Sequence, residues 1–150
     1  MMPISIIIPA YNEEKRIKKT LEIYTKYFSG KKINYEIIVV CDGCKDQTTA
    51  IVKKFCRKNK RIKLIEKGKR LGKGGGVYYG FSKCRGDVIG FTDADNSIGP
   101  NEYEKLLREL KNYDCAIASR RMEGSKTIIP GGKLLWIVSM KVASRIFNLL

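Results

Sequence analysis

Four short apolar runs alternate along the chain with stretches whose apolar residues repeat at helical spacing. Short apolar runs bounded by turn residues are typical of strands buried on both faces of a sheet. Their alternation with helices predicts a mainly parallel α/β sheet with helices on both faces, which is a three-layer α/β/α arrangement. The expected strands cover residues 4–8, 36–40, 62–65 and 88–91, with a further short strand at 115–118. The run at 62–65 alternates in part, so we expect it nearer an edge.

Capping signals place the helices between these runs. Asn12 is expected to cap the first helix, Asp46 the second, and Pro100 suits the first position of the last helix. A helix that ends near residue 83 is expected to bury Val77 and Phe81.

Polar residues follow the strands at 11–13, at Asp42, and at Asp93 and Asp95. Ligands of parallel α/β sheets bind outside the carboxyl ends of the strands, where these residues should gather. Only Ala94 separates the last two carboxylates, and extended chain sends residues i and i+2 to the same side. Two such charges repel unless a cation lies between them, which favours a hard ion such as Mg²⁺ or Mn²⁺. A pair of turn aspartates that begin a loop is the alternative.

The chain is strongly basic, with 30 Lys and Arg residues against 15 Asp and Glu residues and a formal net charge of +15. This balance favours a nucleic acid, an acidic membrane face or a phosphate-rich small molecule as partner, and a lysine-rich surface selected for heat stability is the alternative. The chain has no His, which excludes Ser–His, Cys–His and His–metal chemistry. Cys41 and Cys44 form a single CxxC, which favours reduced, buried thiols in an intracellular protein over a zinc or redox role.

Two basic stretches invite a phosphate-binding interpretation. Residues 68–76 are rich in Lys and Gly, but their spacing matches neither a nucleotide P-loop nor a GxGxxG fingerprint. Lys69, Arg70 and Lys73 beside open backbone amides favour a close-approach surface for phosphates, with a flexible linker as the alternative. The Arg pair at 120–121 is either a solvated basic pair or a clamp for a phosphate or diphosphate.

The end of the sequence differs from the rest. Residues 134–150 are apolar except for Ser139, Lys141, Ser144, Arg145 and Asn148, and Lys141 and Arg145 lie one helical turn apart. This stretch is short for a membrane span, whereas a basic helix that contains Trp136 suits a membrane interface. An ordinary core-packing helix is the alternative. We therefore expect an amphipathic membrane-interface helix at 131–150, after a domain at 1–130.

Taken in order, several segments resemble glycosyltransferase family 2, whose fold is the GT-A nucleotide-sugar fold. Within that family the chain is most similar to dolichyl-phosphate glucosyltransferases, next to dolichyl-phosphate mannose synthases. The matching segments are IIIPAYNEEKRI at 6–17, VCDGCKDQT at 40–48, GKGG at 72–75, RGDVIGFTDAD at 85–95 and ASRR at 118–121. Each segment alone is weak, but the ordered set covers most of residues 4–121.

The resemblance implies a Rossmann-like nucleotide-diphospho-sugar-binding domain at 1–130. It implies that Asp42 faces a uracil or guanine base and that Asp93 and Asp95 hold Mg²⁺ or Mn²⁺ on the diphosphate. It further implies that Arg120 contacts phosphate, with Lys73 beside it. The remaining residues implied to line the nucleotide-sugar pocket are Pro9, Ala10, Tyr11, Glu13 and Ala94.

Two departures from the family pattern qualify the resemblance. Family members usually carry Asp and Ser where this chain has Cys41 and Cys44. The family also continues past the equivalent of Leu150, with a segment that helps to form the acceptor side. Three interpretations follow: a fragment, a chain whose partner supplies the acceptor half, or a donor-binding module with little activity.

The expected activity is inverting transfer of a hexose from a nucleotide sugar to a dolichyl or polyprenyl phosphate, in protein glycosylation. UDP-glucose is favoured over a donor of the GDP-mannose type. A lipid phosphate is already an anion at neutral pH, so a chain without His can use it as nucleophile without a general base. The metal, Arg120 and Lys73 would stabilise the departing diphosphate. We expect a peripheral protein at the cytoplasmic face of a membrane. A basic nucleic-acid-binding domain remains a remote alternative, because no reader motif is present.

Overall fold

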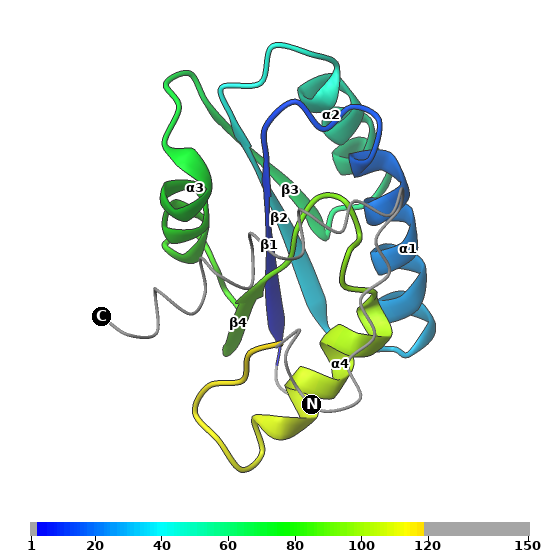
Figure 1. Cartoon of the computed structure of the whole chain (residues 1–150). Helices are drawn as coiled ribbons and strands as arrows, with labels where there is room; N and C mark the ends of the chain where they lie inside the picture. The colour runs from blue at the N-terminus through cyan, green and yellow to red at the C-terminus, as the bar shows by residue number, and fades with distance from the viewer. Residues whose placement is uncertain (1–2, 119–150) are drawn as a thin grey trace, which may run out of the picture. The chain divides into compact units, whose positions relative to one another are not determined.

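The computed structural model describes residues 3–118, in which strands and helices alternate as predicted (Figure 1). The strands are β1 (Ile4–Ala10), β2 (Tyr35–Asp42), β3 (Ile62–Lys67) and β4 (Val88–Phe91). The helices are α1 (Ile17–Gly30), α2 (Thr48–Lys58), α3 (Gly72–Phe81) and α4 (Pro100–Glu109). Pro100 is the first residue of α4, as predicted from its fixed φ angle.

The strands form one parallel sheet in the order β3-β2-β1-β4. Helices α1 and α2 lie on one face of the sheet, and α3 lies on the other (Figure 1). The predicted three-layer α/β/α arrangement is therefore confirmed, and β3 is an outer strand, as its partial alternation indicated. The chain divides into a compact unit up to Asp114 and a second unit from Cys115.

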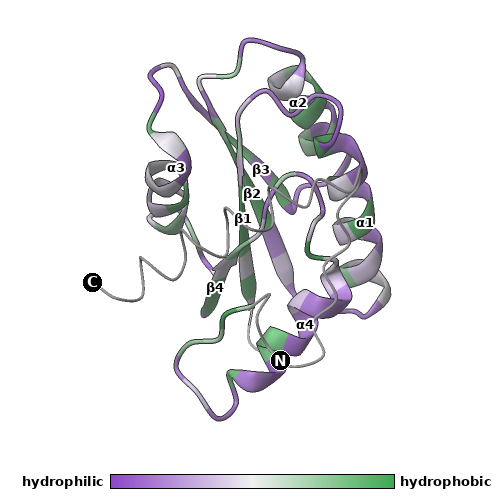
Figure 2. Cartoon of the chain, in the orientation of Figure 1, coloured by the Kyte–Doolittle hydropathy of each residue, from purple (hydrophilic) through white to green (hydrophobic). Residues whose placement is uncertain are grey.

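The two faces of β1 and β2 bury different residues because side chains alternate along a strand. Ile6 and Ile37 belong to a large cluster that includes Tyr24 and Phe28 of α1. On the opposite face, a smaller cluster is formed by Ile7, Ile38 and Val40. Figure 2 shows the consequence: the central strands are apolar, and the hydrophilic positions of the helices face outward.

The buried face of α3 consists of Gly76 and Gly80 rather than the predicted Val77 and Phe81. A Cβ atom at position 80 would lie 2.7 Å from Cγ2 of Ile7, so α3 approaches β1 too closely for a side chain there. The close approach turns Phe81 outward, and its side chain is 39% exposed. The prediction failed because helical periodicity identifies large apolar residues and cannot identify a face made of glycine.

Strand β4 was predicted to be buried on both faces, and this is wrong. Ile89 and Phe91 are 45% and 48% exposed. Within residues 3–118, β4 is an outer strand that pairs with β1 alone, and α3 packs over β1 and β2 instead. An apolar run identifies a strand, but its place in the sheet depends on tertiary pairing.

The first two helices begin differently from one another. Asn12 does not cap a helix: it has φ of +53°, its Oδ1 accepts the N–H of Lys45 at 2.8 Å, and α1 begins only at Ile17. A bond to the next loop therefore replaces the predicted cap. Asp46 accepts the N–H of Thr48 at 3.0 Å just before α2, but the N-cap residue of this helix is Gln47, which makes no side-chain cap bond. The predicted cap is therefore wrong by one residue, although Asp46 still binds the first N–H of the helix.

Three predictions concern the end of the chain. Residues 115–118 have no regular secondary structure, so the predicted strand is wrong. A short apolar run does not specify a strand by itself, because a strand forms only through pairing. Arg120 and the interface helix expected at 131–150 lie outside the described residues. Within residues 3–118, no helix is long and apolar enough to cross a membrane.

Candidate functional site

A pocket of about 370 Å³ lies at the carboxyl ends of the strands. The structure brings together in its lining all the predicted site residues that fall within residues 3–118. They are Pro9, Ala10, Tyr11, Glu13, Asp42, Lys73, Asp93, Ala94 and Asp95. Prediction from the sequence placed Arg70 only on a phosphate-binding surface and missed Arg16, and both also line the pocket. Arg16 could have been found from its position one helical turn after Glu13.

Asp93 and Lys73 face each other across the pocket. Nζ of Lys73, near the beginning of α3, lies 2.6 Å from Oδ1 of Asp93, just after β4. The two side chains are 61% and 37% exposed, respectively, so the ion pair is open to solvent. The ammonium group of Lys73 therefore neutralises the charge of Asp93.

Asp95 is held in its charged form by its neighbours. Partial burial acts to raise the pKa of Asp95, but hydrogen bonds from Ser97 and the charge of Arg16 outweigh burial, so the pKa lies below its ordinary value. The backbone N–H of Ser97 donates to Oδ1 of Asp95 at 2.9 Å. The carboxylate is thus an acceptor with capacity left for a further cationic partner.

Asp93 and Asp95 fit the chemistry of a hard divalent cation, because both are carboxylates that line one pocket. Among residues 3–118, no cluster of three or more His, Cys, Asp or Glu side chains is arranged to hold a metal alone. The donor set therefore suits an ion that takes its remaining ligands from water or from phosphate oxygens of a bound molecule. The assignment of Mg²⁺ or Mn²⁺ to this pair stays a prediction.

Asp42 organises the beginning of α3. Its carboxylate accepts the backbone N–H of Leu71 at 2.6 Å and that of Gly72 at 2.8 Å. Gly72 has φ of +78°, a conformation that favours glycine, at the turn into the helix. Asp42 lines the pocket, and these bonds fix the residue next to Lys73. Its predicted contact with a nucleotide base stays a prediction.

Tyr11 and Arg70 form a second wall of the pocket. The guanidinium carbon of Arg70 lies 3.7 Å from the centroid of the Tyr11 ring, within the range of a cation–π contact. Arg16 forms a two-bond ion pair with Glu13, at 2.7 and 2.9 Å. The pocket therefore contains three positive side chains, Arg16, Arg70 and Lys73, beside its carboxylates.

The loops after β1 and β2 are joined to each other. The N–H of Glu13 donates to Oγ1 of Thr48 at 2.7 Å, and the N–H of Glu14 donates to Asp46 at 3.1 Å. In return, the N–H of Gln47 donates to Glu14 at 2.9 Å. These bonds hold the side of the pocket that contains Glu13.

The segment after β4 is attached to α1. Oγ1 of Thr20 donates to the carbonyl of Ala94 at 2.7 Å, and the hydroxyl of Tyr24 donates to the carbonyl of Ile98 at 2.8 Å. Thr20 and Tyr24 are fully buried. Helix α1 thus fixes the backbone that carries both carboxylates.

The two thiols of the CxxC differ in burial. All five cysteines, which fall within the described residues, are free. Burial raises the pKa of the Cys41 thiol to about 12, and Cys44 donates from Sγ to the carbonyl of Ala10 at 3.3 Å. The prediction of buried thiols therefore holds for Cys41, whereas Cys44 is only partly buried.

A parallel α/β sheet whose strand ends combine carboxylates with Lys and Arg is typical of domains that bind phosphorylated ligands. The sequence comparison is more specific, because residues 5–140 match the family described as glycosyl transferase family 2. The chain belongs to this family.

Curated relatives agree with this assignment. The chain is 33% identical over 134 residues to dolichyl-phosphate beta-glucosyltransferase ALG5C of Trichomonas vaginalis, a match that covers 86% of this chain and 40% of that protein. It is 34% identical to the human dolichyl-phosphate beta-glucosyltransferase, over 73% of this chain and 36% of that protein. Dolichol-phosphate mannosyltransferase of Pyrococcus furiosus is 35% identical, over 83% of this chain and 35% of that protein. The chain therefore spans 35% to 40% of the length of these relatives.

Solved structures show the same GT-A fold. TarS 1-349 of S. aureus in complex with UDP-GlcNAc has a TM-score of 0.59 and 26% identity, over 75% of this chain and 32% of that one. The mannosyltransferase PcManGT of Pyrobaculum calidifontis, in complex with GDP-Man and Mn²⁺, has a TM-score of 0.55 and 26% identity, over 63% of this chain and 28% of that one. The predicted fold is thus confirmed.

Proposed function

We propose that the chain forms the donor-binding part of a glycosyltransferase that moves a hexose from a nucleotide sugar to a dolichyl or polyprenyl phosphate. The observation that carries the proposal is the meeting of Asp93, Asp95 and Lys73 in one pocket of a family 2 chain. Relatives named as dolichyl-phosphate beta-glucosyltransferases favour glucose, and hence UDP-glucose, as donor. A relative named as a dolichol-phosphate mannosyltransferase keeps a donor of the GDP-mannose type as the second choice.

The residues of the pocket have distinct proposed roles. Asp93 and Asp95 would hold Mg²⁺ or Mn²⁺. The bound ion would neutralise negative charge on the departing diphosphate. Lys73 and Arg70 provide positive charge on the α3 side, where the phosphates would lie. Arg120, outside the described residues, is proposed as a further phosphate contact.

The acceptor explains why the reaction needs no general base in this pocket. A lipid phosphate is an anion at neutral pH and can attack the anomeric carbon directly, whereas a hydroxyl would first have to lose a proton. One in-line displacement inverts the configuration at that carbon. The protein would act as a peripheral protein at the cytoplasmic face of a membrane.

A second candidate is a donor-binding module without transfer activity of its own. The specific observation in its favour is that the chain spans only 35% to 40% of the relatives it matches. A partner chain that supplies the acceptor half would restore transfer.

The test incubates the chain with dolichyl phosphate, Mn²⁺ and either labelled UDP-glucose or labelled GDP-mannose, and then measures label in a lipid extract. Calorimetry with UDP, with and without Mn²⁺, measures donor binding separately. Metal-dependent binding with transfer supports the first candidate, and binding without transfer supports the second. Asp95→Asn should abolish the metal-dependent part of binding, whereas Asp87→Asn, an exposed carboxylate before β4, is the matched control. Absence of metal-dependent nucleotide binding would overturn both.

A further inference from the structure

The positive charge of the chain is concentrated in one stretch. Ten of the 30 Lys and Arg residues lie between residues 53 and 70, where Glu66 is the only acidic residue. The rest of the described chain holds nearly as many acidic as basic residues. Residues 53–70 comprise the second half of α2, strand β3 and the loop that leads to α3. We call this stretch the basic edge, because β3 is an outer strand of the sheet.

Most cations of the basic edge have no anionic partner among residues 3–118, although Arg61 and Arg70 stack on the rings of Tyr35 and Tyr11. Lys53 pairs with Glu66 at 2.8 Å, and Lys63 pairs with Glu36 at 2.5 Å. The other basic side chains of this stretch form no ion pair with any residue in 3–118, and most of them are exposed. The exposed ones are Lys54, Arg57, Lys58, Lys60, Arg61, Lys69 and Arg70.

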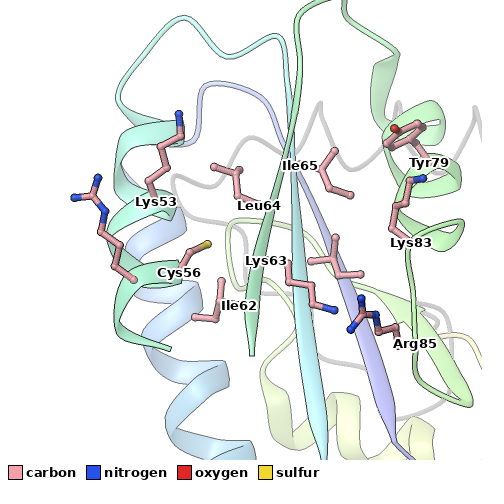
Figure 3. A pocket seen from close by; sticks show the side chains of 11 residues that line it. Lys53, Cys56, Ile62, Lys63, Leu64, Ile65, Tyr79, Lys83 and Arg85 are labelled. Carbon is pink, nitrogen blue, oxygen red and sulfur yellow. The ribbon is translucent and has the colours of Figure 1, made fainter. Parts of the chain in front are cut away.

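A groove of about 680 Å³ runs along β3. Figure 3 shows Lys53 and Cys56 on the α2 side of the strand, and Tyr79, Lys83 and Arg85 on the opposite side. The partly exposed side chains of Leu64 and Ile65 add apolar surface, Leu64 on the α2 side of the strand and Ile65 on the opposite side (Figure 3). The groove thus combines a cationic rim with apolar surface.

The basic edge extends to the pocket at the strand ends. Lys67, the last residue of β3, pairs in register with Asp42. Arg70, at the end of the basic edge, lines the pocket itself. A surface bound to the basic edge would therefore lie beside the entrance through which a ligand reaches Asp93.

We propose that the basic edge binds anionic lipid headgroups and holds the chain on an acidic membrane surface. Each Lys or Arg close to such a surface strengthens binding by roughly fivefold, and apolar side chains such as Leu64 and Ile65 suit the boundary between headgroups and acyl chains. A nucleic acid fits less well, because Phe55 packs against the core, and the ring of Tyr79 in the groove already contacts the ammonium groups of Lys67 and Lys83. The proposal does not depend on transfer activity, since lipid binding is measured without a donor.

The experiment uses the full chain and two kinds of vesicle, one of phosphatidylcholine alone and one that also contains phosphatidylserine, in about 0.15 M salt. Co-sedimentation should show binding to the anionic vesicles and little binding to the neutral ones. The variant Lys54→Glu/Arg57→Glu/Lys58→Glu should bind anionic vesicles at least roughly tenfold more weakly. The milder variant Lys54→Gln/Arg57→Gln/Lys58→Gln should lose affinity in the same direction, and circular dichroism checks that both remain folded.

The control variant Lys19→Glu/Lys26→Glu/Lys111→Glu changes the net charge equally with exposed residues away from the basic edge. It should retain most of the binding. Equal losses in the two triple Glu variants would overturn the proposal, because net charge alone would then explain the binding. Equal binding to neutral vesicles would also overturn it. Binding to duplex DNA that is tighter than binding to vesicles, and that is lost in Lys54→Glu/Arg57→Glu/Lys58→Glu, would assign the surface to nucleic acid instead.

Discussion

Nζ of Lys73 lies 2.6 Å from Oδ1 of Asp93, which places an ammonium group against a carboxylate proposed to hold a metal ion. The two cations cannot both occupy the same position next to Asp93. Binding of a metal with its nucleotide would therefore release Lys73, which could then contact a phosphate group.

The variant Lys73→Met should separate the competition of Lys73 with the metal ion from its contact with a phosphate group. Without the competing ammonium, Mn²⁺ alone should bind more tightly, by up to roughly fivefold for an exposed ion pair. UDP should bind more weakly in the presence of Mn²⁺, because a phosphate contact is lost. Titration of Mn²⁺ followed by electron paramagnetic resonance, with and without UDP, measures both effects. Lys83→Met, two residues after the end of α3, should change neither. Weaker Mn²⁺ binding in Lys73→Met would contradict the competition.

Asp42→Ala should destabilise the fold, because the N–H groups of Leu71 and Gly72 lose their acceptor. Hydrogen bonds to a charged group contribute about 1.5–3 kcal/mol each, so the loss of both predicts a decrease of about 3–6 kcal/mol in the free energy of unfolding. Asp42→Asn keeps one acceptor oxygen and should lose about half as much. Urea denaturation measures the difference. Asp87→Ala is the control, and an equal loss there would show that the cost is not specific to the beginning of α3.

Two glycines of α3 should respond oppositely to the same substitution. Gly80→Ala places a Cβ atom 2.7 Å from Cγ2 of Ile7 and should cost about 1–3 kcal/mol of stability. Gly74→Ala meets no atom within 4 Å and should stabilise the helix by about 0.5–1 kcal/mol. Thermal unfolding of both variants is the measurement. A similar change in both would mean that α3 does not pack through Gly80.

Stability at low pH should depend on Glu104. Hydrogen bonds from Tyr27, Arg108 and Lys31 lower the pKa of Glu104 from 4.5 to about 2. A carboxyl group whose pKa is lower in the folded state contributes stability above its unfolded pKa, and this contribution is lost as the pH falls. The chain should therefore lose stability between pH 4.5 and about pH 2. Glu104→Gln should remove this part of the pH dependence in unfolding curves, and an unchanged slope would contradict the assignment.

Much of the architecture follows from local patterns. The apolar runs identify β1 to β4, and the parallel arrangement follows from their alternation with helices. The same reasoning brings Asp42, Asp93 and Asp95 to one pocket, because residues that follow parallel strands share an edge. The residue types at these positions and the ordered family segments then indicated the remaining lining residues.

Other features depend on contacts that the sequence does not reveal locally. Asn12 accepts a bond from Lys45 in another loop, so its strong capping preference is overridden. Gly80 is buried because of its distance from Ile7, and glycine carries no periodic signal. The ion pair between Lys73 and Asp93 joins residues whose approach depends on how α3 packs on the sheet.

The sides of the pocket differ in their attachment. The loops after β1 and β2 are bound to each other, and the segment after β4 is bound to α1, so these sides belong to the rigid core. The side that carries Arg70 and Lys73 has backbone hydrogen bonds to the two oxygens of Asp42, and it also contacts the strand ends through the solvent-exposed ion pair of Lys73 with Asp93 and the stacking of Arg70 on Tyr11. An adjustment of the pocket to ligands of different size is therefore expected in the turn before α3. The strength of the two hydrogen bonds from this turn to the Asp42 carboxylate limits how far the turn can move.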